Sequence, residues 1–186
     1  PASYSGSGTT LNNLISSSYH ATLYESTSVS AGAIFSTEAG GSLVFDGTND
    51  WARVDSLSDF FRNRDGSFTF QTWVKPTNTA GTRGTVLLSI HSGTGNRMRW
   101  QIRDNAIFVS EPGTTSDTFH YHDTLDAGTW RLYTFVGNNA ANQFTVYLDN
   151  NEIATAAMQN VATYWSDINR ASIGQEWDGT GPGEFF

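Results

Sequence analysis

The chain has 186 residues, a length that fits one domain, and it is acidic and aromatic-rich, with a net charge of −8 and 13% aromatic residues. A surface that follows a phosphate backbone needs a positive field, so this composition excludes nucleic acid as a partner. No apolar run approaches the ~20 residues of a membrane span, which excludes membrane insertion. With 18 glycines, 4 prolines and no cysteine, the chain is typical of many short strands joined by turns and held without disulfides.

The first half of the chain predicts short strands separated by turn residues. Residues 1–30 are rich in Ser, Thr, Asn and Gly, and predict loop with one strand at 21–24. Turn residues from Asp46 to Asp50 separate two further strands. A single helical turn is expected at 56–61, with a serine as its N-cap. The other strands expected in this half cover 42–45, 51–54, 67–75 and 85–91.

The second half continues the same pattern. Residues 96–103 alternate between apolar and polar positions, and the Asp104-Asn105 turn leads into a strand at 106–110. Asn150-Asn151 is expected to form a type I′ turn between two strands, because Asn tolerates positive φ. The remaining predicted strands cover 119–122, 129–136, 144–149, 152–156 and 171–174. About ten short strands with regular turns predict an all-β sandwich or barrel in one domain.

Four ordered blocks resemble the laminin-G/concanavalin-A-like lectin and glucanase superfamily. They are GGSLVFDGTNDWARV, SFTFQTWVKP, LDAGTWRLYTFVGNNAANQFTVYLDNNEIATA and ASIGQ with the Gly-rich tail that follows it, which together cover about residues 40–186. The resemblance implies a two-sheet antiparallel β-sandwich of the jelly-roll type. It also implies one domain over 1–186, in which residues 1–40 are an N-terminal extension packed on the sandwich.

Two further features follow from the resemblance. The stretch SGSGTTLNNLISSSYHATLYES is similar to the N-terminal segment of such domains in phage and marine microbial surface proteins. The family closes with a strand that would begin near Glu184, so the sequence is expected to lack the last strand of the sandwich. An open sheet edge offers unpaired N–H and C=O groups to another chain, which would allow assembly or homo-oligomerisation.

Catalytic carboxylates are the first functional group to consider, because glucanases share this fold. The nearest candidates are Glu176, Asp178 and Glu184. Two-carboxylate catalysis needs acidic residues on one strand, facing a cleft together. Glycines and a proline between 179 and 183 predict a loop instead, so catalysis is not expected here.

Sugar binding needs an exposed aromatic platform beside polar hydrogen-bonding groups. Trp177, flanked by Gln175 and Glu176 in a Gly-rich segment, fits this requirement, and Tyr164 with Trp165 is a second candidate. The sequence gives no preference for Trp51. The tryptophans expected in the core, because they lie within apolar strand patterns, are Trp73, Trp100 and Trp130.

The predicted strand at 96–103 carries a polar row made of Arg97, Arg99, Gln101 and Arg103. One interpretation is an exposed strand face that discourages edge pairing. The other is a basic stripe that binds an anionic glycan or a neighbouring subunit. Together with the His-Tyr-His run at 120–122, the row also supplies the residue types of a polysaccharide lyase, although none of that family's local motifs is present.

Calcium is the metal that the sequence favours. Asp46, Asn49 and Asp50 form a turn rich in oxygen donors, and Asp178 is expected to approach it. The alternative is an ordinary turn in which these side chains stabilise only the backbone.

The function expected first is a non-catalytic structural or recognition module, such as a decoration or fibre component of a virion or surface assembly. A glycan-binding lectin domain, with structural Ca²⁺, is the alternative, and a polysaccharide-degrading enzyme comes third. The expected partners are therefore a glycan or neighbouring protein subunits. The expected location is a virion, the cell surface or the extracellular space.

Overall fold

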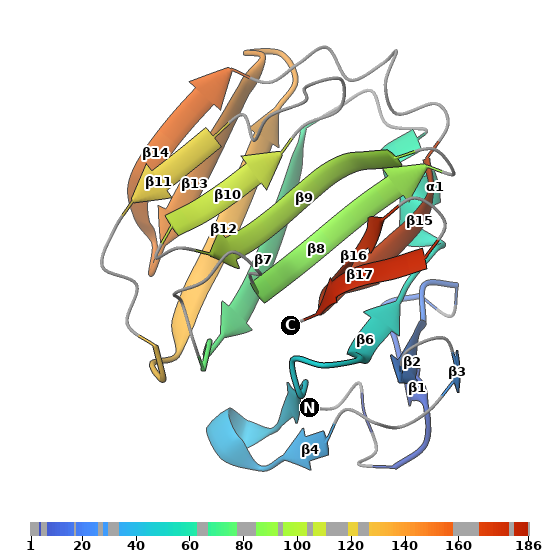
Figure 1. The fold of residues 1–186 in the computed structure, drawn as a ribbon. Helices are drawn as coiled ribbons and strands as arrows, with labels where there is room; N and C mark the ends of the chain where they lie inside the picture. Colours follow the sequence, from blue (N-terminus) through green and yellow to red (C-terminus); the bar gives the residue numbers. More distant parts are fainter. Residues whose placement is uncertain are drawn as a thin grey trace.

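Two antiparallel sheets face each other across an aromatic core in the computed structural model of the protein (Figure 1). The structure describes residues 4, 7–16, 18–25, 28–29, 34–62, 67–77, 85–92, 95–103, 106–110, 119–122, 127–157, 168–178 and 181–185. The two-sheet antiparallel sandwich expected from the sequence is confirmed. Among the described residues, no helix combines the length and apolar character needed to cross a membrane.

The larger sheet has nine described strands in the order β1-β2-β6-β15-β8-β9-β10-β11, with β3 paired to β2. They are β1 (Thr10–Leu11), β2 (Ala21–Glu25), β3 (Ser28–Val29), β6 (Asp50–Arg53), β8 (Thr85–Ser92), β9 (Gly95–Arg103), β10 (Ala106–Ser110), β11 (Phe119–His122) and β15 (Ile168–Ile173). The long strands β8 and β9 form its centre, because nearly every residue of β8 is buried. The N-terminal strand β2 joins this sheet through β6.

The smaller sheet has four described strands in the order β14-β13-β12-β7. They are β7 (Phe68–Val74), β12 (Arg131–Asn138), β13 (Gln143–Leu148) and β14 (Asn151–Ala157). The turn between β13 and β14 is centred on Asp149 and Asn150, which both have positive φ, at 50° and 66°. The turn was predicted at Asn150-Asn151 and lies one residue earlier, because Leu148 pairs with Asn151. Asp149 is fixed there by the Leu132 N–H, 2.9 Å from its Oδ1.

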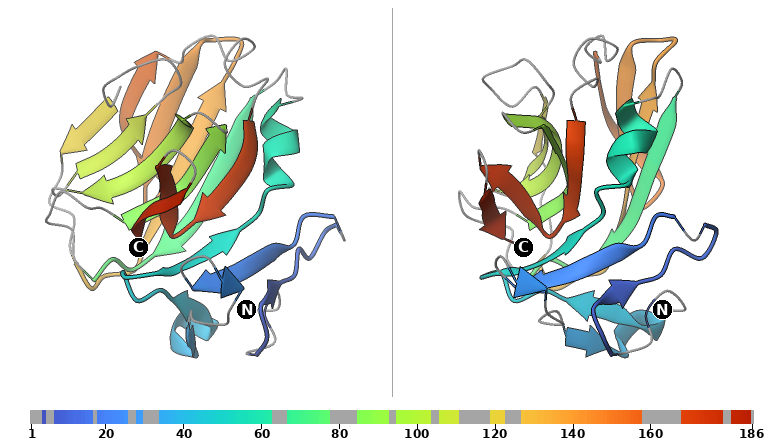
Figure 2. Two further views of the ribbon diagram at one scale, coloured as in Figure 1. Left: turned by 45° about the vertical axis from the view of Figure 1, so that its right-hand side comes forward. Right: turned by 90° about the vertical axis from the view of Figure 1, so that its right-hand side faces the viewer.

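Aromatic rings join the two sheets in the core. Trp100 of β9 stacks on Phe70 of β7 and on Phe135 of β12, with ring centroids 4.9 and 5.0 Å apart. Trp100 is fully buried, as expected from the sequence, and Trp51 is 2% exposed. The helix α1 (Leu57–Arg62) lies where β7 and β15 face each other (Figure 2). Its Phe61 enters the same core, 5.5 Å from the Phe68 ring.

Two hairpins lie outside these sheets. The first pairs β4 (Ile34–Ser36) with β5 (Ser42–Val44), and the short 3-10 helix η1 (Glu38–Gly40) connects them. The second pairs β16 (Gln175–Asp178) with β17 (Gly181–Phe185) and lies across the outer face of the nine-stranded sheet (Figures 1 and 2). The loop expected at 176–184 is thus wrong, since ladder pairing with β17 makes Gln175–Asp178 a strand despite the neighbouring glycines.

Candidate binding site

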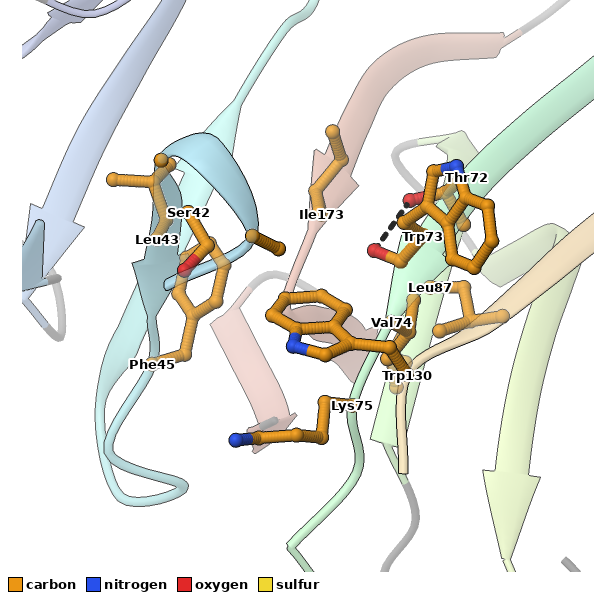
Figure 3. A pocket seen from close by; sticks show the side chains of 13 residues that line it. Ser42, Leu43, Phe45, Thr72, Trp73, Val74, Lys75, Leu87, Trp130 and Ile173 are labelled. Atoms are coloured by element: carbon orange, nitrogen blue, oxygen red, sulfur yellow. Dashed lines mark hydrogen bonds between the residues drawn. The ribbon is translucent and has the colours of Figure 1, made fainter. Parts of the chain in front are cut away.

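A pocket of about 560 Å³ opens between the β4–β5 hairpin and the edge of the sandwich (Figure 3). Residues of η1 and β5 form one wall, and residues of β7, β8 and β15 form the other wall and the floor. A smaller cavity of about 130 Å³ adjoins it and shares Phe45, Lys75 and Trp130 with it. We call the two cavities together the groove. Its main pocket falls within the ~300–1,000 Å³ range of small-molecule sites.

Three aromatic side chains line the groove. Trp130 lies one residue before β12, and its indole points into the pocket toward Phe45, which follows β5 (Figure 3). Trp73 of β7 lies on the opposite side and is 60% exposed. Together with Trp130 and Phe45, the exposed Trp73 ring gives the groove an aromatic lining that is open to solvent.

The polar groups of the groove are held in a fixed arrangement. Glu38 Oε1 accepts hydrogen bonds from Lys75 Nζ at 2.5 Å and from Trp130 Nε1 at 3.1 Å. Lys75 Nζ also lies 5.8 Å from the centroid of the Trp130 ring. The Lys75 hydrogen bond, followed by the Trp130 hydrogen bond, lowers the pKa of Glu38 below its ordinary value of 4.5. Glu38 is therefore a carboxylate at neutral pH, and it orients the indole.

A tight backbone turn makes this arrangement possible. Ala39, Gly40 and Gly41 have positive φ angles of 54°, 79° and 121°. Positive φ is common for Gly but unfavourable for Ala, so the turn holds strain at Ala39. The turn folds β5 back toward the sandwich and places Glu38 opposite Lys75. The floor beneath is apolar, formed by Val74, Leu87 and Ile173.

The Asp46 turn lies at the end of the groove and uses its side chains internally. Asp46 Oδ1 accepts the N–H groups of Thr48 at 2.7 Å and Asn49 at 3.1 Å. Asp50 Oδ2 accepts the Asp46 N–H at 3.1 Å. The pKa of Asp46 is lowered, mainly by the Thr48 N–H, whereas burial raises the pKa of Asp50. Within the described part of the chain, no cluster of three or more His, Asp or Glu residues is arranged to hold a metal, and calcium stays a prediction.

The expected sugar platform around Trp177 is described only in part. Trp177, Glu176 and Asp178 lie on β16, and their side chains fall outside the described part of the chain, as does the side chain of Arg97 on β9. Tyr164 and Trp165 lie outside the described residues altogether.

Gln175 and Arg99 are the predicted ligand-binding residues whose side chains are described, and both lie away from the groove. Gln175 is fully buried, and its Nε2 donates to Ser172 Oγ at 2.9 Å. An exposed hydrogen-bonding role beside Trp177 is therefore wrong for Gln175, because β16 packs it against the sheet. Arg99 is half-buried on β9.

The sequence interpretation missed the groove because it assigned Trp73 and Trp130 to the core. Trp130 is only partly buried. On β7, Phe68 and Val74 are buried and share one face, so strict alternation puts Trp73 on the other face with Gln71. The alternation of side chains along β7 was therefore enough to predict that Trp73 is exposed. No comparable signal exists for Glu38, whose partners Lys75 and Trp130 are 37 and 92 residues away in the chain.

The sequence profile of a family described as the concanavalin A-like lectin/glucanases superfamily matches residues 46–186. No curated protein is similar enough in sequence to count as a relative. The match begins after Phe45, so the η1 and β5 wall of the groove lies outside it.

Several solved structures share the fold at low sequence identity. NanB, in a structure with Optactamide, has a TM-score of 0.60 at 14% identity over 73% of this chain, which spans only 22% of NanB. The Ruminococcus gnavus IT-sialidase CBM40 bound to α2,3-sialyllactose has a TM-score of 0.58 at 14% identity, over 88% of this chain and 84% of that one. Domain 4 of AbnA, an extracellular GH43 arabinanase from Geobacillus stearothermophilus, in complex with arabinotriose, has a TM-score of 0.54 at 14% identity, over 89% and 78%.

Proposed function

Because the chain belongs to the concanavalin A-like lectin/glucanases superfamily, we propose that it is a non-catalytic carbohydrate-binding domain whose site is the groove. The observation that carries the proposal is Trp130, an indole held in the pocket by a hydrogen bond from its Nε1 to Glu38. Two neighbours of the same fold, CBM40 and domain 4 of AbnA, are described in complex with sugars, which supports the same function here.

The chemistry of the groove suits a sugar. A pyranose or furanose ring has apolar C–H faces and polar hydroxyl edges, so it needs aromatic surface together with a few fixed hydrogen-bonding groups. Trp130, Trp73 and Phe45 supply the aromatic surface. Lys75 and Glu38 supply fixed polar groups at the rim.

The carboxylates of the groove suit binding better than catalysis. A glycosidase needs one carboxyl group with a raised pKa as general acid, paired with a second carboxylate. The pKa values of Glu38 and Asp46 are both lowered, and donor groups already bind both side chains. Neither group would carry a proton at neutral pH. We therefore infer that a bound glycan is held without being cleaved.

Of the two functions expected first from the sequence, this proposal adopts the glycan-binding one. None of the neighbours reported above is described as a virion protein, whereas two of them are described in complex with sugars. An extracellular or cell-surface location fits the proposal, since AbnA, whose domain 4 has the same fold, is described as extracellular. Calcium is not required by the groove as proposed, because Glu38 and Asp46 are satisfied by protein donors.

The test is glycan-array screening of the wild type, followed by calorimetric titration of the best ligand with variants. Trp130→Ala is expected to weaken binding at least tenfold, about 1.4 kcal/mol, because it removes the central ring. Trp130→Phe keeps a ring but loses the bond to Glu38, and is expected to be intermediate.

Phe60→Ala is the matched control, since Phe60 is a 47% exposed aromatic residue on α1 that does not line the groove. It should bind as the wild type does. Undiminished binding by a folded Trp130→Ala variant would remove the groove as the site, and release of shorter sugars would refute the non-catalytic assignment.

A further inference from the structure

The outer face of the nine-stranded sheet carries a set of polar side chains at its centre. Alternate residues of β8 and β9 enter the core, namely Leu88, Ile90, Met98, Trp100 and Ile102. Successive side chains of a strand point to opposite faces, so the intervening residues lie on the outer face. These are Ser89, His91, Arg99, Gln101 and Arg103. We call them, with Arg170 of β15, the arginine face.

Strand register brings these residues together. Ser172 of β15 pairs with Ser89 of β8, and Ser89 pairs with Arg99 of β9, so the three form one row across the sheet. Arg170 pairs with His91 in the neighbouring row. Directly paired side chains on one face lie about 5 Å apart, close enough to contact one ligand together.

The β16–β17 hairpin covers this face. β16 contacts both β8 and β9, and Figure 2 shows the hairpin on the side of the sheet away from β12 and β13. Ser89, His91 and Gln101 are fully buried, whereas Arg99 and Arg103 remain half-buried. The Nε atoms of Arg99 and Arg103 and the Nη1 atom of Arg170 are also buried, so the hairpin covers the guanidinium groups as well.

Two buried oxygen atoms beneath the hairpin have no hydrogen-bond partner among the described residues. They are Ser89 Oγ and Gln175 Oε1, in side chains that are 0% exposed. Gln175 is anchored through its other amide atom, since Nε2 donates to Ser172 Oγ at 2.9 Å. Buried polar atoms are nearly always paired in folded proteins. Ser89 Oγ, which belongs to the sheet and not to the hairpin, is therefore a position at which a hydroxyl group of a ligand would be bound.

The charge of this region is opposite to that of the chain as a whole. Arg99, Arg103 and Arg170 lie on one face of a protein with a net charge of −8. The Arg103 guanidinium lies 4.1 Å from the centroid of the Phe108 ring, which holds it in place. A guanidinium group forms paired hydrogen bonds with a planar carboxylate, which makes Arg well suited to bind acidic sugars.

The covering hairpin is itself acidic. Residues 175–186 contain Glu176, Asp178 and Glu184 and no Lys or Arg, a formal charge of −3. The hairpin and an acidic ligand carry the same sign of charge, and both would be attracted to the arginine residues. The two would therefore compete for the face.

We propose that the arginine face is a second binding site, specific for a carboxylated oligosaccharide, and that the β16–β17 hairpin covers it. The arginines bind the uronate carboxylates, and Ser89 binds a sugar hydroxyl. A nucleic acid is disfavoured because the neutral groups between the arginines match hydroxyls rather than a continuous phosphate backbone. This proposal does not rest on the groove.

The test titrates oligogalacturonate into the full chain at low salt, with calorimetric detection. A variant that combines Glu176→Gln, Asp178→Asn and Glu184→Gln keeps the hairpin but removes its negative charge. We expect it to bind at least tenfold more tightly than the wild type. Adding Arg99→Gln and Arg103→Gln to this variant is expected to abolish the gain in affinity. Adding only Arg170→Gln to it is expected to reduce the gain.

Arg131→Gln is the matched control, because Arg131 pairs with Asp149 on the smaller sheet. It should leave oligogalacturonate binding unchanged, with circular dichroism confirming the fold of each variant. If Arg99→Gln with Arg103→Gln prevents folding, Arg170→Gln still decides the question. The proposal is overturned if no variant binds, if the arginine variants bind as well as their parent, or if dextran sulfate of the same length binds equally well.

Discussion

The two hairpins outside the large sheets cover the same sandwich in opposite ways. The β4–β5 hairpin leaves aromatic side chains in solvent, with Trp73 60% exposed. The β16–β17 hairpin places polar side chains out of solvent, with Ser89 and Gln175 fully buried. Exposed aromatic surface and buried polar groups are the two departures from ordinary folding that carry most information. The two proposed sites thus differ in their chemistry, and each lies where a hairpin departs from that rule.

Both regions depend on the core that joins the sheets, and the largest expected effect comes from removing its centre. Trp100→Ala deletes the ring that stacks on Phe70 and Phe135. We expect the free energy of unfolding to fall by about 3–5 kcal/mol, measured by urea denaturation. Groove and arginine-face binding should then decline together, in proportion to the folded fraction. A loss under about 1 kcal/mol would mean that the stack does not hold the sheets together.

Gly174 connects the two regions, and its substitution tests whether they are independent. It joins β15 to β16 with a φ of +88°, and an added Cβ would lie 3.3 Å from Phe45 Cδ1 in the groove wall. Gly174→Ala is expected to lower the free energy of unfolding by about 1–3 kcal/mol, through positive φ and tight packing. It should also weaken glycan binding in the groove, because Phe45 must move.

Gly128→Ala separates these two causes. Gly128 has a similar φ of +78°, but an added Cβ would meet nothing within 4 Å. We expect Gly128→Ala to lower the free energy of unfolding by about 1–2 kcal/mol in the same denaturation assay, through the cost of positive φ alone. Its affinity for glycan in the groove should be unchanged. Equal effects of the two substitutions on glycan binding would contradict the proposed contact between Gly174 and Phe45.

The sequence predicted most strands of the sandwich because their side chains alternate and their turns use Asp, Asn and Gly. β9 illustrates this, since the alternation of Met98, Trp100 and Ile102 with polar residues is enough to define its buried face. The error at β16 has a local cause. Gly179, Gly181 and Gly183 resemble a loop, and only pairing across Gln175–Asp178 makes the segment a strand.

The groove could be predicted only in part, because it is assembled from distant segments. Both Trp73 and Trp130 were expected in the core because they lie within apolar strand patterns, although strict alternation along β7 puts Trp73 on the outer face. The Glu38–Lys75 pair depends on the positive φ angles at 39–41, which two glycines permit but do not require. The arginine row was visible on β9, while its cover became apparent only from the packing of β16 on β8 and β9.

The smallest expected effect concerns the charge of Glu38 and separates the groove from the arginine face by pH. Lys75 and Trp130 lower the pKa of Glu38, so its ion pair is complete above the ordinary value of 4.5 and is lost as the pH falls through the lower folded value. Wild-type glycan affinity is therefore expected to be constant from neutral pH to about 5 and to fall at lower pH, by about fivefold or less because the pair is exposed. Glu38→Gln should have the weaker affinity at neutral pH and no such decline, so that the wild type approaches it as the pH falls. Calorimetric titrations of both proteins between pH 3.5 and 7 check this, and an identical decline in the two would assign the pH dependence to another group.

Oligogalacturonate binding in the same buffers should be insensitive to Glu38→Gln, since none of the residues of the arginine face contacts Glu38 through a described hydrogen bond.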